Sequence, residues 1–343
     1  MERGVIRIGT RGSALALVQA RWVQAALPGP SEIIIIRTTG DVRQDVRLDL
    51  VGGVGLFTKE IERALLDGEI DLAVHSLKDL PVEQPAGLVL GAIPARAPVA
   101  DLLLVRPDAL DLERDIPLRE GVRVGTSSTR RIALLAGVRP DLEAVPLRGN
   151  VPTRIRKCAE DRPPTGSDDA EPSAVVDGDT VLPGPSECEA VLLAQAGIQR
   201  LQQDLGGLVA MQLNPAFWPC APGQGALGLE IRADDPDTAA RVATLDHPET
   251  RACVEAERRL LQISGGGCHS AFGAWASLDG DLASLHVALL TPEGALRLQR
   301  FAAPALSEAR DSAAAWLEAG APDVAPLQRS AEDWLCRAAP AWS

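Results

Sequence analysis

Tyrosine is absent from this sequence of 343 residues and phenylalanine occurs only four times, so aromatic stacking cannot be widespread. The net charge of −13 argues against general nucleic-acid binding, which favours a basic domain. No apolar run reaches 18 residues, and the sequence therefore predicts no membrane-spanning helix. We expect an acidic protein that binds neither nucleic acid nor membrane.

Several motifs of well-known chemistry are also missing. The six cysteines include no C-x-x-C pair, so zinc and dithiol redox sites have little support. No G-x-S-x-G turn is present for a serine hydrolase, and no G-x-x-x-x-G-K-[ST] loop for nucleotide phosphates. The first residues lead straight into a strand-like segment without a signal or transit pattern. We therefore expect a cytoplasmic protein whose cysteines stay thiols.

Arginine is concentrated in one part of this acidic chain. Between Arg123 and Lys157, eight cations stand against Asp141 and Glu143, which leaves a charge of about −19 for the rest. Arginine suits carboxylates and phosphates because its planar guanidinium donates two parallel hydrogen bonds. The alternative is a solvated basic face. The eight cations are Arg123, Arg130, Arg131, Arg139, Arg148, Arg154, Arg156 and Lys157.

A pattern of strand, turn and helix occurs twice. The first copy has a strand at Val5–Thr10, a Gly/Ser turn and a helix at Ala14–Ala20. The second has a strand at Val122–Thr126, a turn of small polar residues and a helix from Arg130. Such a turn presents backbone N–H groups and the positive end of the helix dipole to an anion. The repeat predicts two similar α/β domains, each with an anion site.

Further apolar segments favour the α/β class. Ile70–Val74 and Glu189–Ala194 are typical of buried parallel strands. Ile33–Ile36 and Leu102–Val105 are typical of short strands, and Phe57–Leu66 is typical of a helix. A further unit begins after about residue 247, with helically spaced Cys253, Ala256 and Leu260. Residues 159–187 are rich in Pro, Gly, Ser and Asp, and we interpret them as an exposed, mobile insertion.

Polar side chains follow the strand at Ile70–Val74, in the sequence His75-Ser76-Leu77-Lys78-Asp79. Sites in α/β folds lie at the carboxyl ends of strands, so this segment and both arginine-bearing turns should face one cleft. Asp79 suits acid–base work or the stabilisation of a cation, and Lys78 suits carboxylate binding or a Schiff base. The alternative is a capped helix start with a local ion pair.

Cys268 follows three glycines in Gly265-Gly266-Gly267-Cys268-His269. Glycines leave room for a bulky group, so this thiol could be a nucleophile or the attachment point of a covalent cofactor. The alternative is a hinge with an incidental cysteine, because the spacing supplies no partner. With the arginines near glycine turns, these candidates imply a ligand with several carboxylates.

Seven motifs occur in order and nearly end to end along the chain: I-G-T-R-x-S-x-L-A-L, G-x-G-L-F-x-K-E, A-V-H-S-x-K-D-x-P, G-T-S-S-x-R-R, L-R-G-N-V-x-T-R, A-P-G-Q-G-A and E-R-x-L-x-x-x-x-G-G-G-C. Together they resemble the motifs of the porphobilinogen deaminase or hydroxymethylbilane synthase family. The resemblance implies an α/β fold of three domains. The first two would be similar to type II periplasmic binding protein domains, and the third would be a smaller α/β domain carrying Cys268. The first domain would consist of residues 1–98 and 224–244, the second of residues 99–223, which include the insertion 159–187, and the third of residues 245–343. Hinges would lie near residues 95–100 and 243–248.

The resemblance also implies a transferase of tetrapyrrole (heme) biosynthesis. It would join four porphobilinogen molecules head to tail onto a dipyrromethane cofactor, which is bound to Cys268 through a thioether, and would release ammonia and then hydroxymethylbilane. Asp79 would be the catalytic residue that stabilises positive charge as the amine leaves. Carboxylate-binding residues would be Arg11, Ser13, Lys78, Ser128, Arg130, Arg131, Arg148, Arg154 and Arg200, with Phe57, His75 and Ser76 elsewhere in the cleft. No metal or nucleic acid is implied, and a monomer is expected.

A few positions depart from the family pattern. Val54 and Leu50 stand where lysines are usual, Glu189 replaces a usual aspartate, and Ala271 a usual proline. The insertion at 159–187 is also unusual. A non-catalytic or weakly active anion-binding paralogue of the same fold is therefore the alternative.

Overall fold

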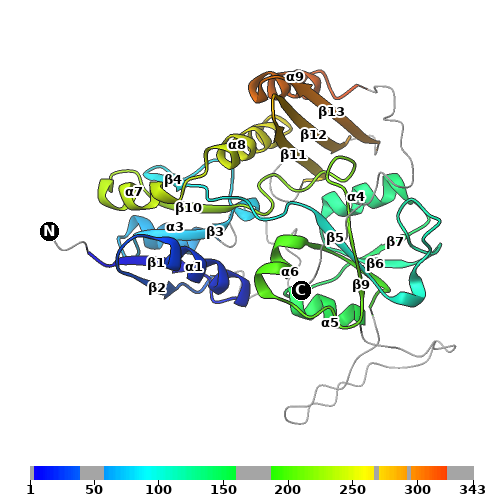
Figure 1. Cartoon of the computed structure of the whole chain (residues 1–343), viewed down its shortest axis with the longest axis horizontal. Coiled ribbons are helices and arrows are strands. Elements are labelled where there is room, and N and C mark those ends of the chain that lie inside the picture. The colour runs from blue at the N-terminus through cyan, green and yellow to red at the C-terminus, as the bar shows by residue number, and fades with distance from the viewer. Residues whose placement is uncertain (1–3, 39–57, 160–186, 266–269, 292–294, 323–343) are drawn as a thin grey trace, which may run out of the picture.

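The computed structural model describes residues 4–38, 58–159, 187–265, 270–291 and 295–322. Within these residues the chain forms two five-stranded sheets and a separate three-stranded sheet, with helices packed around them (Figure 1). The expected α/β class is confirmed. No helix in this part of the chain is long and apolar enough to cross a membrane.

The first sheet has the strand order β2-β1-β3-β10-β4. Its strands are β1 (Ile6–Thr10), β2 (Ser31–Ile35), β3 (Leu72–Ser76), β4 (Leu88–Ala92) and β10 (Leu227–Arg232), and its helices are α1 (Ala14–Ala26), α3 (Lys59–Leu66) and α7 (Pro236–Val242). The apolar side chains of Ile8, Val23 and Leu229 are fully buried in its core, as the alternating pattern near the N-terminus predicts.

The second sheet has the order β7-β6-β8-β5-β9. Its strands are β5 (Asp101–Val105), β6 (Arg123–Gly125), β7 (Glu143–Val145), β8 (Ala190–Ala194) and β9 (Val209–Gln212), and its helices are α4 (Thr129–Val138), α5 (Val151–Ala159) and α6 (Gln195–Leu201). Single 3₁₀ turns occur at η1 (Leu77–Asp79), η2 (Pro107–Ala109) and η3 (Ala243–Leu245).

Both five-stranded sheets have the same topology, which confirms the repeat seen in the sequence. In each sheet four strands run in the same direction, and one antiparallel strand lies between the third and the fourth of them. The antiparallel strand is the first one that the chain forms after it has crossed from one sheet to the other. It is β5 after the crossing from the first sheet to the second, and β10 after the return to the first sheet. The expectation that β3 and β8 are parallel strands is therefore only half right, because each is parallel on one side and antiparallel on the other.

The two repeated turns also end alike. Ser13 caps α1 by accepting a hydrogen bond from Ala16 N at 3.3 Å, and Ser128 caps α4 by accepting from Arg131 N at 3.5 Å. Each serine thus satisfies one of the helix's unpaired N–H groups and positions the residues that follow.

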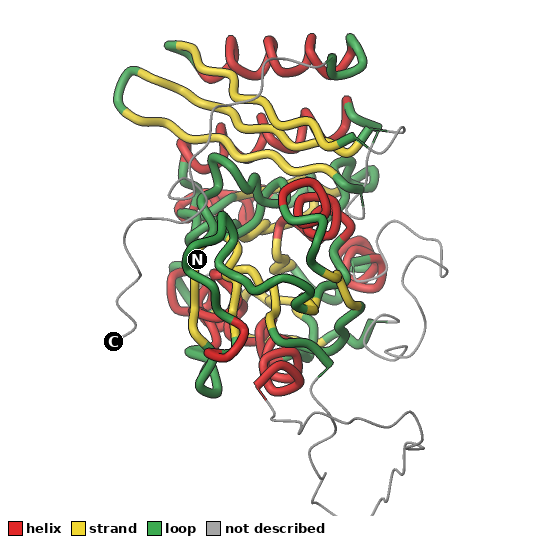
Figure 2. Tube along the Cα trace, turned by 90° about the vertical axis from the view of Figure 1, so that its right-hand side faces the viewer, coloured by secondary structure: helices red, strands yellow, loops and turns green. Residues whose placement is uncertain are grey.

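The third unit consists of α8 (Pro248–Ile263), β11 (Phe272–Asp279), β12 (Leu282–Leu290), β13 (Leu296–Ala303) and α9 (Leu306–Glu318). Its antiparallel sheet lies at the top of the molecule beside both helices (Figure 2). The helical spacing of Cys253, Ala256 and Leu260 is confirmed, since all three are buried on α8. The three sheets fall within the three expected segments, and the domain bounds themselves stay a prediction.

A single buried carboxylate joins the three units. Glu257 of α8 accepts hydrogen bonds from Arg96 at 2.7 and 2.9 Å, from Gly223 N at 2.8 Å and from Ala276 N at 2.9 Å. Arg96 and Gly223 lie on the two crossings between the first and second sheets, and Ala276 lies in β11. Burial alone would lower the pKa of Arg96, but the Glu257 carboxylate outweighs it and raises that pKa.

Candidate active site

A cavity of about 1480 Å³ is lined by residues of both five-stranded halves, where strands end and helices begin. The turns before α1 and α4, the segment after β3 and the start of α6 all contribute to its wall. The expectation that these segments face one cleft is confirmed. Of the expected site residues, the cavity is lined by Arg11, Ser13, Ser76, Lys78, Asp79, Arg131, Arg148, Arg154 and Arg200.

The wall of this cavity is strongly cationic. Among the described residues that line it, Asp79 is the one carboxylate, against eight cations: Arg11, Arg37, Lys78, Arg131, Arg148, Arg154, Lys157 and Arg200. Arg131 has Asp101 as a carboxylate partner at 2.7 Å, and Lys157 has Glu187 at 2.8 Å. A chain of net charge −13 therefore concentrates positive charge at one site, which attracts anions.

Burial perturbs two arginines of the wall. It lowers the pKa of Arg200, and together with the charges of Arg131 and Arg148 it lowers the pKa of Arg154. Arg154 and Arg200 donate to backbone carbonyls, at 2.8 and 2.7 Å respectively. A bound carboxylate would favour the charged form of both arginines, so the site is electrostatically suited to an anion.

Lys78 and Asp79 lie on the 3₁₀ turn η1, directly after β3. Leu77 and Leu80 anchor this turn because both are fully buried. The buried Arg258 of α8 supports this segment by donating to the carbonyl of Leu77 in the turn, at 3.3 Å, and to those of Leu80 and Pro81 just after it, at 2.9 and 2.6 Å. Asp79 is left exposed and Lys78 half-buried, and burial lowers the pKa of Lys78 against the opposing effect of Asp79.

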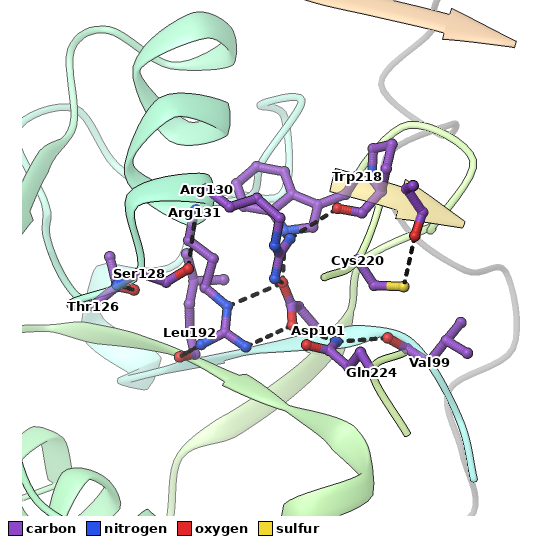
Figure 3. Close-up of polar contacts among 12 residues, drawn as sticks. Val99, Asp101, Thr126, Ser128, Arg130, Arg131, Leu192, Trp218, Cys220 and Gln224 are labelled. Carbon is purple, nitrogen blue, oxygen red and sulfur yellow. Dashed lines mark hydrogen bonds and ion pairs between the residues drawn. The ribbon is translucent and has the colours of Figure 1, made fainter. Parts of the chain in front are cut away.

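Arg130 and Arg131, at the start of α4, share one buried carboxylate (Figure 3). Asp101 accepts from Arg130 Nη2 at 2.7 Å and from Arg131 Nε and Nη2 at 3.1 and 2.7 Å. It also accepts from the indole of Trp218 at 3.0 Å and the amide of Gln224 at 2.9 Å. Burial alone would raise the pKa of Asp101, but the two guanidiniums outweigh it and hold the pKa well below its usual range.

The two arginines, expected as binders of carboxylates, are therefore also structural. Arg130 Nη1 donates to Pro219 O and Arg131 Nη1 donates to Leu192 O, each at 2.9 Å. Only 4% of Arg130 and 6% of Arg131 is exposed. Arg131 also lines the large cavity, so a ligand there can contact only the part of its guanidinium that is not bound to Asp101.

A smaller hollow of about 40 Å³ lies between this cluster and the third unit. Lys78, Ser128 and Arg130 line one side, and Leu261 and Ser270 line the other. The buried Nε of Arg130 has no hydrogen-bond partner among the described residues, which leaves a donor for a ligand. Leu261 and Ser270 lie on either side of the glycine–cysteine segment in the sequence.

Residues 6–240 match the family model described as "Porphobilinogen deaminase, dipyromethane cofactor binding domain". The chain belongs to the porphobilinogen deaminase family. The porphobilinogen deaminase of Caulobacter sp. (strain K31) is 43% identical to it over 92% of this chain and 93% of its own. That of Syntrophobacter fumaroxidans (strain DSM 10017 / MPOB) is 42% identical over 94% of this chain and 97% of its own.

Solved structures resemble the chain only distantly. A periplasmic sulfonate-binding protein, SsuA from Methylobacillus flagellatus KT, is 10% identical with a TM-score of 0.38, over 77% of this chain and 70% of its own. An ancestral arginine-binding protein bound to glutamine is 12% identical with a TM-score of 0.34, over 71% and 91%. These scores are too low to carry an argument.

In this chain, a member of the porphobilinogen deaminase family, His75 does not lie in the cleft, although the sequence predicted it there. Successive side chains of a strand point to opposite faces, so His75 and Ser76 diverge at the end of β3. Ser76 lines the cavity and accepts a hydrogen bond from Gln19 Nε2 at 2.8 Å. His75 is buried on the other face, where its Nε2 lies 3.2 Å from the fully buried carboxylate of Glu230.

The arginine common to both copies of the repeat is also structural. Arg7 donates its backbone N–H and its guanidinium to Asp71, and Arg123 donates the same two groups to Glu189. Each carboxylate lies just before the third strand of its sheet. Glu189, noted as a departure from the family's usual aspartate, therefore makes the same contacts as Asp71. The arginine-rich stretch thus divides into structural arginines and arginines of the cavity wall.

Four of the residues singled out from the sequence lie outside the described residues. They are Cys268, Phe57, Val54 and Leu50, and most of the insertion 159–187 lies there too. Sequence reasoning missed Arg37 and Asn150, which line the cavity. Arg37 directly follows the apolar run Ile33–Ile36, so its position after a strand was a usable signal. In the described part of the chain no cluster of His, Cys, Asp or Glu could hold a metal ion.

Proposed function

We propose that this protein catalyses the porphobilinogen deaminase reaction. Four porphobilinogen molecules are joined head to tail, ammonia is released at each addition, and hydrolysis releases the linear tetrapyrrole hydroxymethylbilane. The observation that carries the proposal is the cavity wall, whose described residues include eight cations and one carboxylate, that of Asp79. Each pyrrole of the substrate carries an acetate and a propionate, so the growing product is a polyanion that needs such a wall.

The size of the cavity supports a chain of several rings. Sites for single small ligands usually enclose about 300–1,000 Å³. The volume of about 1480 Å³ exceeds that range and leaves space for linked pyrroles. We assign the carboxylates of these rings to Arg11, Arg148, Arg154 and Arg200, with Ser13, Ser128, Lys78, Arg130 and Arg131 as the further donors.

We assign the catalytic role to Asp79. Its carboxylate is the one negative charge among the described residues that line the cavity, and the supported turn η1 fixes its backbone. Positive charge develops on the substrate pyrrole as its amine leaves, and a fixed carboxylate stabilises that charge. The same carboxylate can carry a proton to the departing amine. The surrounding cations hold the substrate carboxylates away from Asp79 and keep the reacting ring at it.

The residues at the smaller hollow fit the dipyrromethane cofactor named in the family description. Three donor-bearing side chains, Lys78, Ser128 and Arg130, meet there, and Arg130 keeps an unpartnered Nε. When bound, dipyrromethane supplies two linked pyrroles and the free ring carbon to which the first substrate unit is joined. We propose that Cys268 holds it through a thioether. Support comes from Leu261 and Ser270, which line this hollow and lie on either side of Cys268 in the sequence.

We further propose that the protein acts as a cytoplasmic monomer. The described residues that line the cavity include both the cationic donors and the carboxylate of Asp79, so one chain supplies both kinds of group that the proposed reaction needs. The cysteines of the described chain, Cys158, Cys188, Cys220 and Cys253, are thiols, which suits a reducing compartment.

The test is turnover of porphobilinogen by the purified full chain, followed as ammonia release and as linear tetrapyrrole. Asp79→Asn should lower kcat by a factor of about 100 or more while leaving substrate binding within a few-fold. Asp67→Asn is the matched control, because Asp67 is an exposed carboxylate of the same half, which pairs with Arg63. Activity of Asp79→Asn close to that of the control would remove Asp79 from the mechanism.

The mass of the intact protein tests the cofactor. The wild-type chain should carry two linked pyrroles on Cys268, and Cys268→Ser should carry none. An unmodified wild-type chain that binds porphobilinogen without releasing ammonia would favour the alternative, an anion-binding paralogue.

A further inference from the structure

Two buried cysteines meet beside the second sheet, away from the cavity wall. Cys158 lies in the last turn of α5, and Cys188 lies two residues before β8. Both are fully buried, with 0% of either residue exposed, and both belong to the apolar cluster that includes Leu147 and Ile155. Hydrogen bonding between the two thiols raises the pKa of Cys158 and lowers that of Cys188. Nothing in the proposed reaction uses this pair.

The backbone holds the two cysteines together. The carbonyl of Lys157, the residue before Cys158, accepts a hydrogen bond from the N–H of Glu187, the residue before Cys188, at 3.2 Å. The side chains of Lys157 and Glu187 form an ion pair at 2.8 Å. The contact between the thiols is therefore set by two adjoining segments rather than by the side-chain torsions alone.

We propose that Cys158 and Cys188 are a modification site, which a low-molecular-weight disulfide of the glutathione class converts reversibly to an intramolecular disulfide. The Cys188 thiolate attacks one sulfur of oxidised glutathione, the S–S bond breaks and one glutathione thiolate leaves. The Cys158 thiolate then attacks the Cys188 sulfur and expels the second glutathione. Two protein thiols are oxidised, one glutathione disulfide is reduced to two thiols, and the two protons pass to the released thiolates.

The order of attack follows from the contact between the sulfurs. The Cys158 S–H donates to the Cys188 sulfur, which lowers the pKa of Cys188 and raises that of Cys158. The thiolate is the attacking species in disulfide exchange, so Cys188 reacts first and Cys158 resolves the mixed disulfide. Because both thiols are buried, the exchange needs a local opening between α5 and β8, and the sulfurs must then approach to about 2.05 Å.

The disulfide would stabilise the part of the fold that carries the arginines of the cavity. It ties α5, which holds Arg154, to β8, which leads into α6 and Arg200. It also closes a chain loop of about 30 residues, and loops of that length restrict the unfolded chain appreciably. We expect the oxidised protein to melt roughly 5–10 °C higher than the reduced protein.

The experiment oxidises the native full chain with oxidised glutathione, quenches with acid and alkylates the remaining thiols without reduction. The intact protein should be two hydrogen masses lighter and should take up two fewer alkyl groups. Trypsin leaves both cysteines in one peptide, residues 158–200, because Arg162 precedes a proline and no other Lys or Arg intervenes. Cleavage before the aspartates between them, such as Asp177, should leave two fragments joined until a reductant is added.

Two variants separate this pair from the other cysteines. Cys158→Ala should lose both the cross-link and the thermal shift, whereas Cys253→Ala, which removes a buried thiol of the third unit, should keep both. Full alkylation of Cys158 and Cys188 after oxidation would overturn the proposal. A stable mixed disulfide with glutathione, or a cross-link to another cysteine, would overturn it too. The wild-type mass and fragments decide the question even if a variant fails to fold, and none of these readouts depends on catalysis.

Discussion

Replacing Asp101 with asparagine tests how the second sheet holds Arg130 and Arg131. The substitution keeps the volume of the side chain but removes the charge that two guanidiniums share, at 2.7 Å from each. Removing one partner of a buried ion pair costs about 3–5 kcal/mol, because an uncompensated charge stays buried. Two guanidiniums would be uncompensated here, so we expect a loss in the free energy of unfolding near the top of that range, about 5 kcal/mol.

The measurement is urea-induced unfolding of the variant and the wild type at pH 7, where Asp101 is ionised because its pKa lies well below the usual range. Asp108→Asn is the matched control in the same half of the chain. Asp108 is also paired with an arginine, Arg106 at 3.1 Å, but 64% of its side chain is exposed. Exposed pairs contribute little, and the control should change the free energy of unfolding by less than about 1 kcal/mol.

A loss below about 1 kcal/mol in Asp101→Asn would refute this reasoning. It would mean that the guanidiniums of Arg130 and Arg131 reach solvent or another carboxylate once Asp101 is neutral. A loss as large in Asp108→Asn would refute it as well, because burial would then not decide the energy.

Two further predictions concern the third unit. Burial lowers the pKa of His286 to about 4, while the unfolded chain binds a proton there below about 6.5, so stability should fall as pH drops from about 6.5 to about 4 and lose about 3 kcal/mol. Unfolding measured across this pH range should show a flatter profile in His286→Gln, and an unchanged profile would contradict the assignment. Glu257→Gln should cost about 3–5 kcal/mol in urea unfolding, since it leaves the guanidinium of Arg96 buried without its carboxylate. Glu255→Gln, an exposed position on the same helix, should cost less than about 1 kcal/mol, and equal losses in the two variants would argue against the buried pair.

The local pattern of the sequence was enough to predict most of what surrounds the site. A strand, a turn with serine and a helix were expected twice, and β1 with α1 and β6 with α4 have that form. Local patterns succeed there because hydrophobic period and helix capping act over a few residues. The side on which His75 falls could also have been predicted, since neighbours in a strand cannot share a face.

The sequence could not show which arginines already have a carboxylate partner. Asp101 is 29 and 30 residues from Arg130 and Arg131, and Glu189 is 66 residues from Arg123. These pairs form only when β5, β6 and β8 meet in one sheet. The antiparallel position of β5 in that sheet depends in turn on where the chain crosses from the first sheet to the second. Charge counting along the sequence therefore overestimated the cations available to a ligand.

The two groups of arginine differ in what burial costs them. Arg123, Arg130 and Arg131 each face a carboxylate, so the fold itself compensates their charge. Arg154 and Arg200 are half-buried and donate to backbone carbonyls, and partial burial lowers their pKa, so the folded chain keeps them charged at a cost. A bound carboxylate stabilises the charged form of both arginines, and this stabilisation contributes to the affinity for a polyanion. The same arrangement in a chain of net charge −13 directs anions to one place, because the outer surface repels them and the cavity does not.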